Sequence, residues 1–221
     1  MLIKICGLST PETMEAALAA GADMIGLVLH PKSPRHVTME QAVELAGIAR
    51  GKAEIVALIV DWDGTRAAEM AGMLRPDWLQ LHGSETPEAV AGLAAASGRQ
   101  VMKALGIAAA DDLGGIARYA GVADRILLDA KPPKDAAYPG GHGRPFDWGL
   151  LASLDPALSF MLSGGLDPAN IGTAVHVTRP AGVDVSSGVE SAPGVKDPAR
   201  IVEYVAAARK AAASVQEGSS A

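Results

Sequence analysis

The sequence predicts an α/β fold, a single-domain (β/α)8 barrel of the TIM type. Eight apolar runs of strand length recur along the 221 residues, and segments with helical spacing separate them. Alternation of strands and helices indicates a parallel sheet, and eight units indicate closure into a barrel. The length lies at the lower end of the range for such barrels. The runs cover residues 2–6, 24–29, 55–60, 78–81, 101–105, 125–129, 160–163 and 182–186.

Helix signals lie between these runs. Apolar residues follow helical spacing at positions 42, 45, 46 and 49, and again at 201, 204, 205 and 208. Gly21 and Gly98 stand where helices should end. Helix starts are predicted where a capping side chain precedes a proline, at Thr10 with Pro11, Thr86 with Pro87 and Asp167 with Pro168.

Two of the predicted loops are longer than the rest, and both follow strands. They span residues 30–38 and 130–147. Loops that follow the strands of such a barrel face its active site, so these two should carry substrate contacts. The second contains Gly140, Gly141 and Gly143 and could form a mobile lid. The alternative is a tolerated insertion at the surface.

Composition narrows the class of protein. The formal net charge of −6 argues against nucleic-acid binding, which favours a basic patch. Cys6 is the single cysteine, so neither an intrachain disulfide nor a cysteine zinc cluster can form. We expect no signal peptide, no membrane span and a cytoplasmic location. We expect the barrel to span residues 1–213, followed by a disordered polar tail over 214–221.

Alternation along the strands predicts which side chains point into the barrel. Lys4 and Cys6 should face inward from the first strand, Asp129 from the sixth, and Asp184 and Ser186 from the eighth. Cys6 and Asp129 then lie at the carboxyl-terminal rim, where a base and an acid can move a proton between carbon and oxygen. The nearby Lys4 would favour a thiolate. Simpler alternatives are a small buried apolar role for Cys6 and a loop or capping role for Asp129.

A phosphate site is predicted at the ends of strands seven and eight. Glycine-rich turns and backbone N–H groups at a short helix start suit anions, and barrels commonly bind phosphate at these loops. Arg35, in the loop after strand two, could bind a carboxylate at the other end of a ligand, or could be a solvated charge. The turn residues are Gly164 and Gly165 after strand seven, and Ser186, Ser187 and Gly188 after strand eight.

Several short motifs lie along the chain in a fixed order and spacing. They are residues 4–8 (KICGL), 31–35 (PKSPR), 80–83 (QLHG), 128–129 (LD), 140–148 (GGHGRPFDW), 162–166 (LSGGL), 182–190 (GVDVSSGVE) and 193–197 (PGVKD). Together these motifs resemble those of phosphoribosylanthranilate isomerase. The resemblance runs from about residue 2 to about residue 212.

The resemblance implies an Amadori rearrangement in tryptophan synthesis from chorismate, its third step, without cofactor or metal. N-(5-phosphoribosyl)anthranilate would become 1-(2-carboxyphenylamino)-1-deoxyribulose 5-phosphate. Asp129 would be the general acid that opens the furanose ring, and Cys6 the base that removes the C2 proton. Arg35 would hold the anthranilate carboxylate, and the glycine and serine turns the phosphate. Asp184 would lie near the ribose or organise the phosphate loop.

Some positions depart from the family pattern, and other functions stay open. His30, His36, His142 and Arg144 with Pro145 vary the loops around the site, while His82 could reach the substrate or be structural. Related phosphosugar barrels are alternatives, among them an aminoimidazole-carboxamide ribotide isomerase and indole-glycerol-phosphate synthase. Another is a barrel that binds a phosphorylated ligand without turnover. We expect a small phosphorylated partner and a monomer or homodimer.

Overall fold

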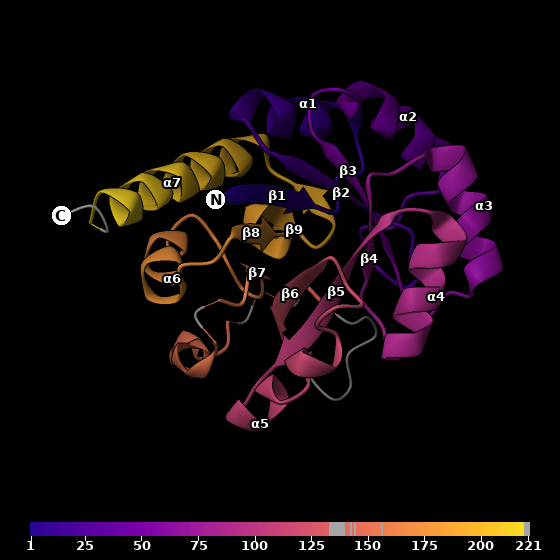
Figure 1. The fold of residues 1–221 in the computed structure, drawn as a ribbon. Coiled ribbons are helices and arrows are strands. Elements are labelled where there is room, and N and C mark those ends of the chain that lie inside the picture. Colours follow the sequence, from indigo (N-terminus) through magenta and orange to yellow (C-terminus); the bar gives the residue numbers. More distant parts are fainter. Residues whose placement is uncertain (133–139, 142, 144, 156, 219–221) are drawn as a thin grey trace.

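The computed structural model describes residues 1–132, 140, 141, 143, 145–155 and 157–218. Eight parallel strands follow chain order around a closed barrel, which confirms the predicted fold class (Figure 1). Strand β8 closes the ring on β1, with Asp184 opposite Lys4. The strands are β1 (Leu2–Cys6), β2 (Met24–Val28), β3 (Glu54–Ile59), β4 (Trp78–Leu81), β5 (Gln100–Ile107), β6 (Arg125–Ala130), β7 (Phe160–Leu162) and β8 (Gly182–Val185).

Helices cover the outside of the barrel, but less evenly than strict alternation predicted. After β5 the chain forms only the short α5 (Ala110–Leu113) and the 3-10 helix η1 (Ile116–Arg118). Between β6 and β7, the helical element among the described residues is the 3-10 helix η2 (Trp148–Ser153). The remaining helices are α1 (Pro11–Ala20), α2 (Met39–Ala49), α3 (Gly64–Leu74), α4 (Pro87–Ser97), α6 (Ile171–Thr178), the 3-10 helix η3 (Ser187–Val189) and α7 (Pro198–Gly218).

Most of the predicted helix ends are confirmed by hydrogen bonds. Thr10 caps α1 by accepting the Thr13 N–H, and Thr86 caps α4 in the same way. Gly21 and Gly98 end these two helices with φ of 88° and 64°, which glycine adopts without strain. The third predicted start differs: Asp167 caps a turn, and α6 begins only at Ile171.

The carboxyl-terminal helix is longer than the sequence predicted. Helix α7 continues through 214–218, which were expected to belong to a disordered tail, while 219–221 lie outside the described residues. It packs against α1 and α6. Its first half buries Ile201, Tyr204 and Val205, and once a helix is nucleated each further turn is cheap to add. Figure 1 shows its far end projecting past the barrel.

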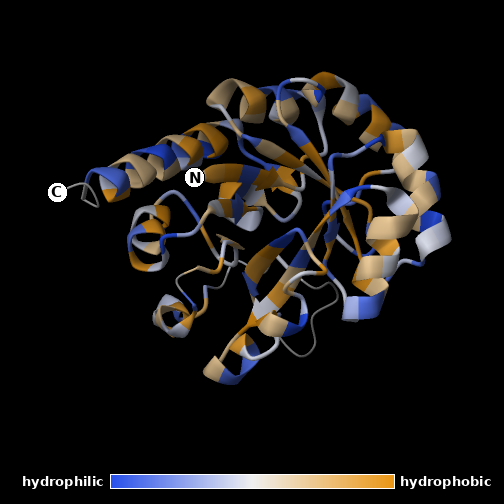
Figure 2. Cartoon of the chain, viewed as in Figure 1, coloured by the Kyte–Doolittle hydropathy of each residue, from blue (hydrophilic) through white to orange (hydrophobic). Residues whose placement is uncertain are grey.

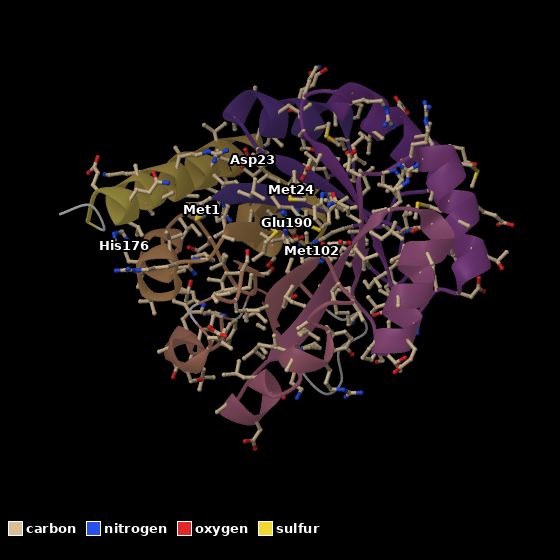
Figure 3. All side chains as sticks on the ribbon, in the orientation of Figure 1. Met1, Asp23, Met24, Met102, His176 and Glu190 are labelled. Atoms are coloured by element: carbon tan, nitrogen blue, oxygen red, sulfur yellow. The ribbon has the colours of Figure 1, made fainter. Side chains whose placement is uncertain are left out.

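The barrel interior is apolar at its amino-terminal end. Figure 2 shows the apolar strands inside a ring of helices with mixed faces, and Figure 3 labels Met24 and Met102 near the middle of the ring. A layer of inward-facing apolar side chains fills the amino-terminal half of the barrel, so space for a ligand lies toward the carboxyl ends of the strands. The inward-facing layer consists of Met24, Val56, Trp78, Met102, Ala104, Leu127 and Met161.

A small hairpin follows η3 and returns the chain to the rim. Strands β9 (Glu190–Ala192) and β10 (Val195–Lys196) pair antiparallel, which places Glu190 opposite Lys196. Both side chains are buried. Among the described helices, none has the length and hydropathy needed to cross a membrane.

Candidate active site

A cavity opens at the carboxyl ends of the strands. Its empty space is about 620 Å³, including the part open to solvent. Nine of the ten predicted site residues line it: Cys6, Arg35, His82, Asp129, Gly164, Gly165, Asp184, Ser186 and Ser187. Gly188 does not. A Cβ on Gly188 would collide with the carbonyl oxygen of Leu166, so glycine there lets the loops after β7 and β8 pack closely.

Cys6 lies over a buried ion pair. Lys4 Nζ is 2.8 Å from Asp184 Oδ1, and Ser163 Oγ donates to Asp184 Oδ2 at 3.3 Å. Gly26 of the neighbouring strand leaves room for both groups, because a Cβ there would lie 2.8 Å from Cys6 Sγ and 3.1 Å from Lys4 Nζ. The inward orientation predicted for Lys4, Cys6 and Asp184 is therefore confirmed.

Burial and charge act in opposite directions on the thiol. Burial raises the pKa of Cys6 and the Lys4 ammonium lowers it, with a net rise. For Lys4, burial lowers the pKa, but attraction from Asp184 and Cys6 outweighs that effect and the net shift is upward. Lys4 therefore stays positively charged beneath the sulfur and offsets part, but not all, of the cost that burial imposes on the thiolate.

Asp129 is the last residue but one of β6, lies at the same rim and contacts a histidine. Its Oδ1 accepts the Ala130 N–H at 2.9 Å, and its Oδ2 lies 3.1 Å from His82 Nε2. His82 Nδ1 is in turn 3.1 Å from the amide nitrogen of Gln80. The structure thus brings the predicted acid and His82 together, which neither strand pattern alone could show.

The loops after β7 and β8, where an anion site is predicted, form glycine-rich turns at the rim. Gly164 and Gly165 have φ of 87° and 65°, the left-handed region that favours glycine. A Cβ on Gly164 would collide with the backbone nitrogen of Ala130. The first N–H groups of η3, at Ser187 and Gly188, have no partner within their own helix and can point at an anion.

Arg35 is buried rather than solvated, and an acidic side chain holds it. Its Nε and Nη2 contact the two carboxylate oxygens of Glu190 at 2.7 and 2.9 Å, and Nη2 also donates to the Gly141 carbonyl at 3.2 Å. Lys196 Nζ contacts the same carboxylate at 2.6 Å and the Ser186 carbonyl at 2.9 Å. Figure 3 labels Glu190 close to the middle of the barrel in this view.

Arg35, Lys196 and Glu190 form a cluster of two cations and one carboxylate. Burial and the neighbouring charges shift the pKa values of Lys196 and Glu190. Burial lowers the pKa of Lys196 to about 8, although Glu190 opposes the change. Burial raises the pKa of Glu190, but the hydrogen bonds from Arg35 and the charge of Lys196 outweigh it, so the net shift is downward. Glu190 is therefore ionised at neutral pH, and the cluster keeps a positive excess beside the cavity.

Sequence reasoning assigned no role to Gln80, Glu190 or Lys196. All three belong to the motifs that carry the family resemblance, so those motifs were the signal. Glu190 and Lys196 reach the rim only because the β9–β10 hairpin folds back, and periodicity does not predict such a hairpin.

The long loops reach the cavity where the structure describes them. His30 and Ser33 line it from the loop after β2, and Gly140 and Gly141 from the loop after β6. His36 is exposed. The predicted lid also includes residues 133–139, His142 and Arg144, which lie outside the described residues, so lid motion stays a prediction. Within the described part of the chain, no three His, Cys, Asp or Glu side chains are grouped as metal ligands.

The chain matches the model of a known enzyme family over most of its length. The model of N-(5'-phosphoribosyl)anthranilate isomerase matches residues 3–207. The chain belongs to this family. A relative of the same name from Afipia carboxidovorans is 56% identical over 214 residues, covering 97% of this chain and 92% of its own.

Solved structures of the family share the fold. A crystal structure of phosphoribosyl anthranilate isomerase in complex with reduced 1-(o-carboxyphenylamino)-1-deoxyribulose 5-phosphate is 31% identical, with a TM-score of 0.83. It covers 95% of this chain and 100% of its own. A Thermotoga maritima structure, described as monomers of a dimeric phosphoribosylanthranilate isomerase, is 32% identical with the same TM-score and the same coverage.

Proposed function

We propose that the chain catalyses the Amadori rearrangement of N-(5-phosphoribosyl)anthranilate to 1-(2-carboxyphenylamino)-1-deoxyribulose 5-phosphate, the third step of tryptophan synthesis from chorismate. The observation that carries this proposal is that Cys6 and Asp129 line one cavity together with the glycine-rich turns after β7 and β8. Family membership names the reaction, and the geometry supplies the groups that it needs.

The first step of the proposal assigns the acid role to Asp129. Its carboxyl group protonates the ring oxygen of the furanose, the C1–O bond breaks, and the nitrogen lone pair forms a Schiff base. Because Oδ1 accepts the Ala130 N–H, the transferable proton belongs on Oδ2. General acid catalysis of this kind typically contributes about 10²–10⁴-fold in rate.

The second step of the proposal assigns the base role to Cys6. Its thiolate removes the proton from C2, and the electron pair of the C–H bond moves toward the positively charged nitrogen to give an enolamine. The enolamine then becomes the ketone by proton shift from oxygen to carbon. Lys4 supports the thiolate from beneath, and the Lys4–Asp184 pair keeps that ammonium fixed.

Substrate binding in this proposal uses both ends of the cavity. The phosphate lies against the turns at Gly164 and Gly165 and at Ser186, Ser187 and Gly188. Arg35 attracts the anthranilate carboxylate, while Glu190 occupies its Nε and Nη2 edge. We infer that the net positive charge of Arg35, Lys196 and Glu190 together attracts the substrate carboxylate, and that Glu190 fixes the position of Arg35.

The proposal also covers oligomeric state, location and cofactor use. The proposed site residues all come from one chain, so activity does not require a second copy. We expect a monomer or homodimer in the cytoplasm, whose partner is the small phosphorylated substrate, and no step of the proposed reaction needs a metal or cofactor.

The test is turnover of freshly generated phosphoribosylanthranilate by the purified chain, followed as loss of substrate fluorescence. Rapid loss without added metal or nucleotide supports the proposal. A folded sample with no turnover contradicts it. The aminoimidazole substrate is then assayed, to separate a related isomerase from a barrel that only binds a phosphorylated ligand.

A further inference from the structure

His82, which contacts Asp129, is also in contact with the buried side-chain amide of Gln80, which has no role in the proposed reaction. Gln80 is fully buried, and its Nε2 lies 3.1 Å from His82 Nδ1. Its Oε1 has no hydrogen-bond partner among the described residues. A buried carbonyl oxygen without a donor costs free energy, so the orientation of this amide calls for an explanation.

The orientation of the Gln80 amide decides where the His82 proton lies. If Nε2 of Gln80 donates to Nδ1, a neutral imidazole carries its proton on Nε2 and donates it to Asp129 Oδ2. That state holds Asp129 as a carboxylate, which cannot act as an acid. The opposite orientation places Oε1 against Nδ1 and needs almost no extra space, because amide oxygen and nitrogen are nearly equal in size. Nδ1 then carries a proton, and Nε2 faces Oδ2 with its lone pair.

We propose that Gln80 Oε1 holds a proton on His82 Nδ1, so that His82 Nε2 and Asp129 Oδ2 share one exchangeable proton and His82 positions and recharges the acid. This inference rests on the proposed role of Asp129. The carboxyl group is oriented for it, because Oδ1 is occupied by the Ala130 N–H. Gly140 covers the other oxygen closely, since a Cβ there would lie 2.8 Å from Oδ2.

The proton balance closes over one turnover. The Oδ2–H bond of Asp129 breaks, and its proton goes to the ring oxygen, which leaves neutral His82 beside a carboxylate. Solvent then protonates His82 Nε2, and that proton passes to Oδ2, which restores the acid. Cys6 releases the C2 proton to solvent. His82 is the entry point because its side chain is 13% exposed, against 6% for Asp129.

Other charged groups face this pair and contribute to its pH dependence. They include Cys6 and Asp184 across the cavity, and His30 and Arg35 from the loop after β2. Lys103 and Glu85 form a separate buried pair beside β4, at 2.7 Å, and Lys131 is paired with Asp112. Since these groups are unchanged in the variants below, a directed shift between variants reports on the His82–Asp129 pair.

The first test is the pH profile of kcat/KM for His82→Asn. Ordinary aspartate and histidine side chains lose a proton near about pH 3.9 and about pH 6.5. Without the imidazole we expect the limb governed by the pair to move to lower pH. At neutral pH, kcat should fall at least about tenfold with KM within about twofold, because proton supply is lost and binding is not.

The second test is Gln80→Glu, which is nearly isosteric and adds a negative charge at Nδ1. It should stabilise the imidazolium and move the same limb to higher pH, opposite to His82→Asn. A role in packing alone predicts no such opposed shifts. The control is His176→Asn on helix α6, where the histidine contacts the Gly172 carbonyl and Ser214 at the periphery (Figure 3). Its profile should match the unmodified protein.

A direct readout is ¹⁵N NMR of the histidine rings in the unmodified protein, with His82 assigned by its loss in His82→Asn. We expect the neutral imidazole to carry its proton on Nδ1, with Nε2 bare. A bare Nδ1 in the neutral imidazole, or unchanged limbs in both variants, overturns the inference. Asp129→Asn separates the two levels. Near-normal turnover in Asp129→Asn removes the acid role itself, whereas an inactive Asp129→Asn beside a normal His82→Asn profile removes only the relay.

Discussion

At the scale of single residues, the surroundings of Cys6 shift the pKa of its thiol in opposite directions. Burial raises the pKa of its thiol and Lys4 lowers it, with a net rise above the ordinary value. At neutral pH the free protein therefore holds mostly thiol. A raised thiol pKa means that the reactive thiolate accumulates only as pH increases, so thiol reactivity should rise with pH above the usual cysteine range.

The Lys4→Met variant tests this balance. Removing the ammonium leaves Lys196 as the remaining charge that opposes the desolvation and the Asp184 charge, so the midpoint of iodoacetamide reactivity against pH should rise by about one unit or more. The midpoint is independent of steric access to the buried sulfur. Lys4→Arg keeps the charge and should stay close to the unmodified midpoint. A midpoint that falls, or does not move in Lys4→Met, would show that Lys4 does not act on the thiol.

Arg35→Lys tests the binding role of the guanidinium. Lysine keeps the charge but cannot reproduce the two contacts that Glu190 makes with Arg35. We expect KM to rise at least about tenfold with kcat changed by only a few-fold. Arg50→Lys is the control, because Arg50 contacts the carbonyls of Leu74 and Arg75 away from the cavity. Unchanged KM with a large fall in kcat would contradict the role.

At the same scale, the sequence predicts side-chain orientation better than side-chain partners. Alternation placed Cys6, Asp129 and Asp184 on the inward face, as observed. It could not pair Asp129 with His82, because that contact joins β6 to β4 and depends on barrel curvature. Nor could it predict that Glu190 binds Arg35 across 155 residues of chain. The roles of these residues in catalysis stay predictions.

At the scale of elements, the apolar runs and caps predicted most of what forms. All eight strands appear close to their expected bounds because buried parallel strands leave a continuous apolar signature. The fifth connection, and the described part of the sixth, form shorter helices than alternation implied. Gly114 and Gly115 directly follow α5, and glycine is a poor helix former. Helix α7 outruns its predicted end because its anchored apolar face lets later turns propagate.

Tyr204 of α7 offers a test of helix packing. Its side chain is fully buried, and its hydroxyl has no hydrogen-bond partner among the described residues. Tyr204→Phe should leave stability unchanged or raise it by up to about 1 kcal/mol. The matched variant Tyr119→Phe loses a 3.0 Å bond to the Glu85 carbonyl and should lose about 1 kcal/mol. Thermal unfolding decides, at about 2–4 °C per kcal/mol, and a large loss for Tyr204→Phe would contradict this packing account.

At the scale of the whole molecule, one end of the barrel carries the proposed site and the other carries contacts that stabilise the fold. The carboxyl ends carry the cavity, while the amino-terminal ends are joined by a repeated carboxylate contact. Asp23, Asp77 and Asp124 each stand just before or at the start of an even-numbered strand. They accept the N–H of Ile3, Ile55 and Val101 respectively, each at 2.7 Å. Each contact joins one strand to the strand before it, which suits a ring assembled from pairs of units.

Asp77→Ala tests this separation of stability from function. Losing the contact with Ile55 should cost about 1–2 kcal/mol in urea denaturation, because a charge-assisted hydrogen bond is removed. Turnover per folded molecule should not change, since the site lies at the opposite end. Asp77→Asn keeps an acceptor oxygen and should lose less. A large fall in kcat for a folded Asp77→Ala protein would show that the two ends are coupled.

The central claim is that one cavity performs acid–base catalysis on a phosphorylated aminosugar with Asp129 as acid and Cys6 as base. The most direct measurement is kcat for phosphoribosylanthranilate with Cys6→Ala and Asp129→Asn beside the unmodified chain, with circular dichroism as the check on folding. We predict rapid turnover by the unmodified chain and a loss of at least about 10²-fold in each folded variant. Near-normal turnover in either folded variant would remove that residue from the mechanism and contradict the account.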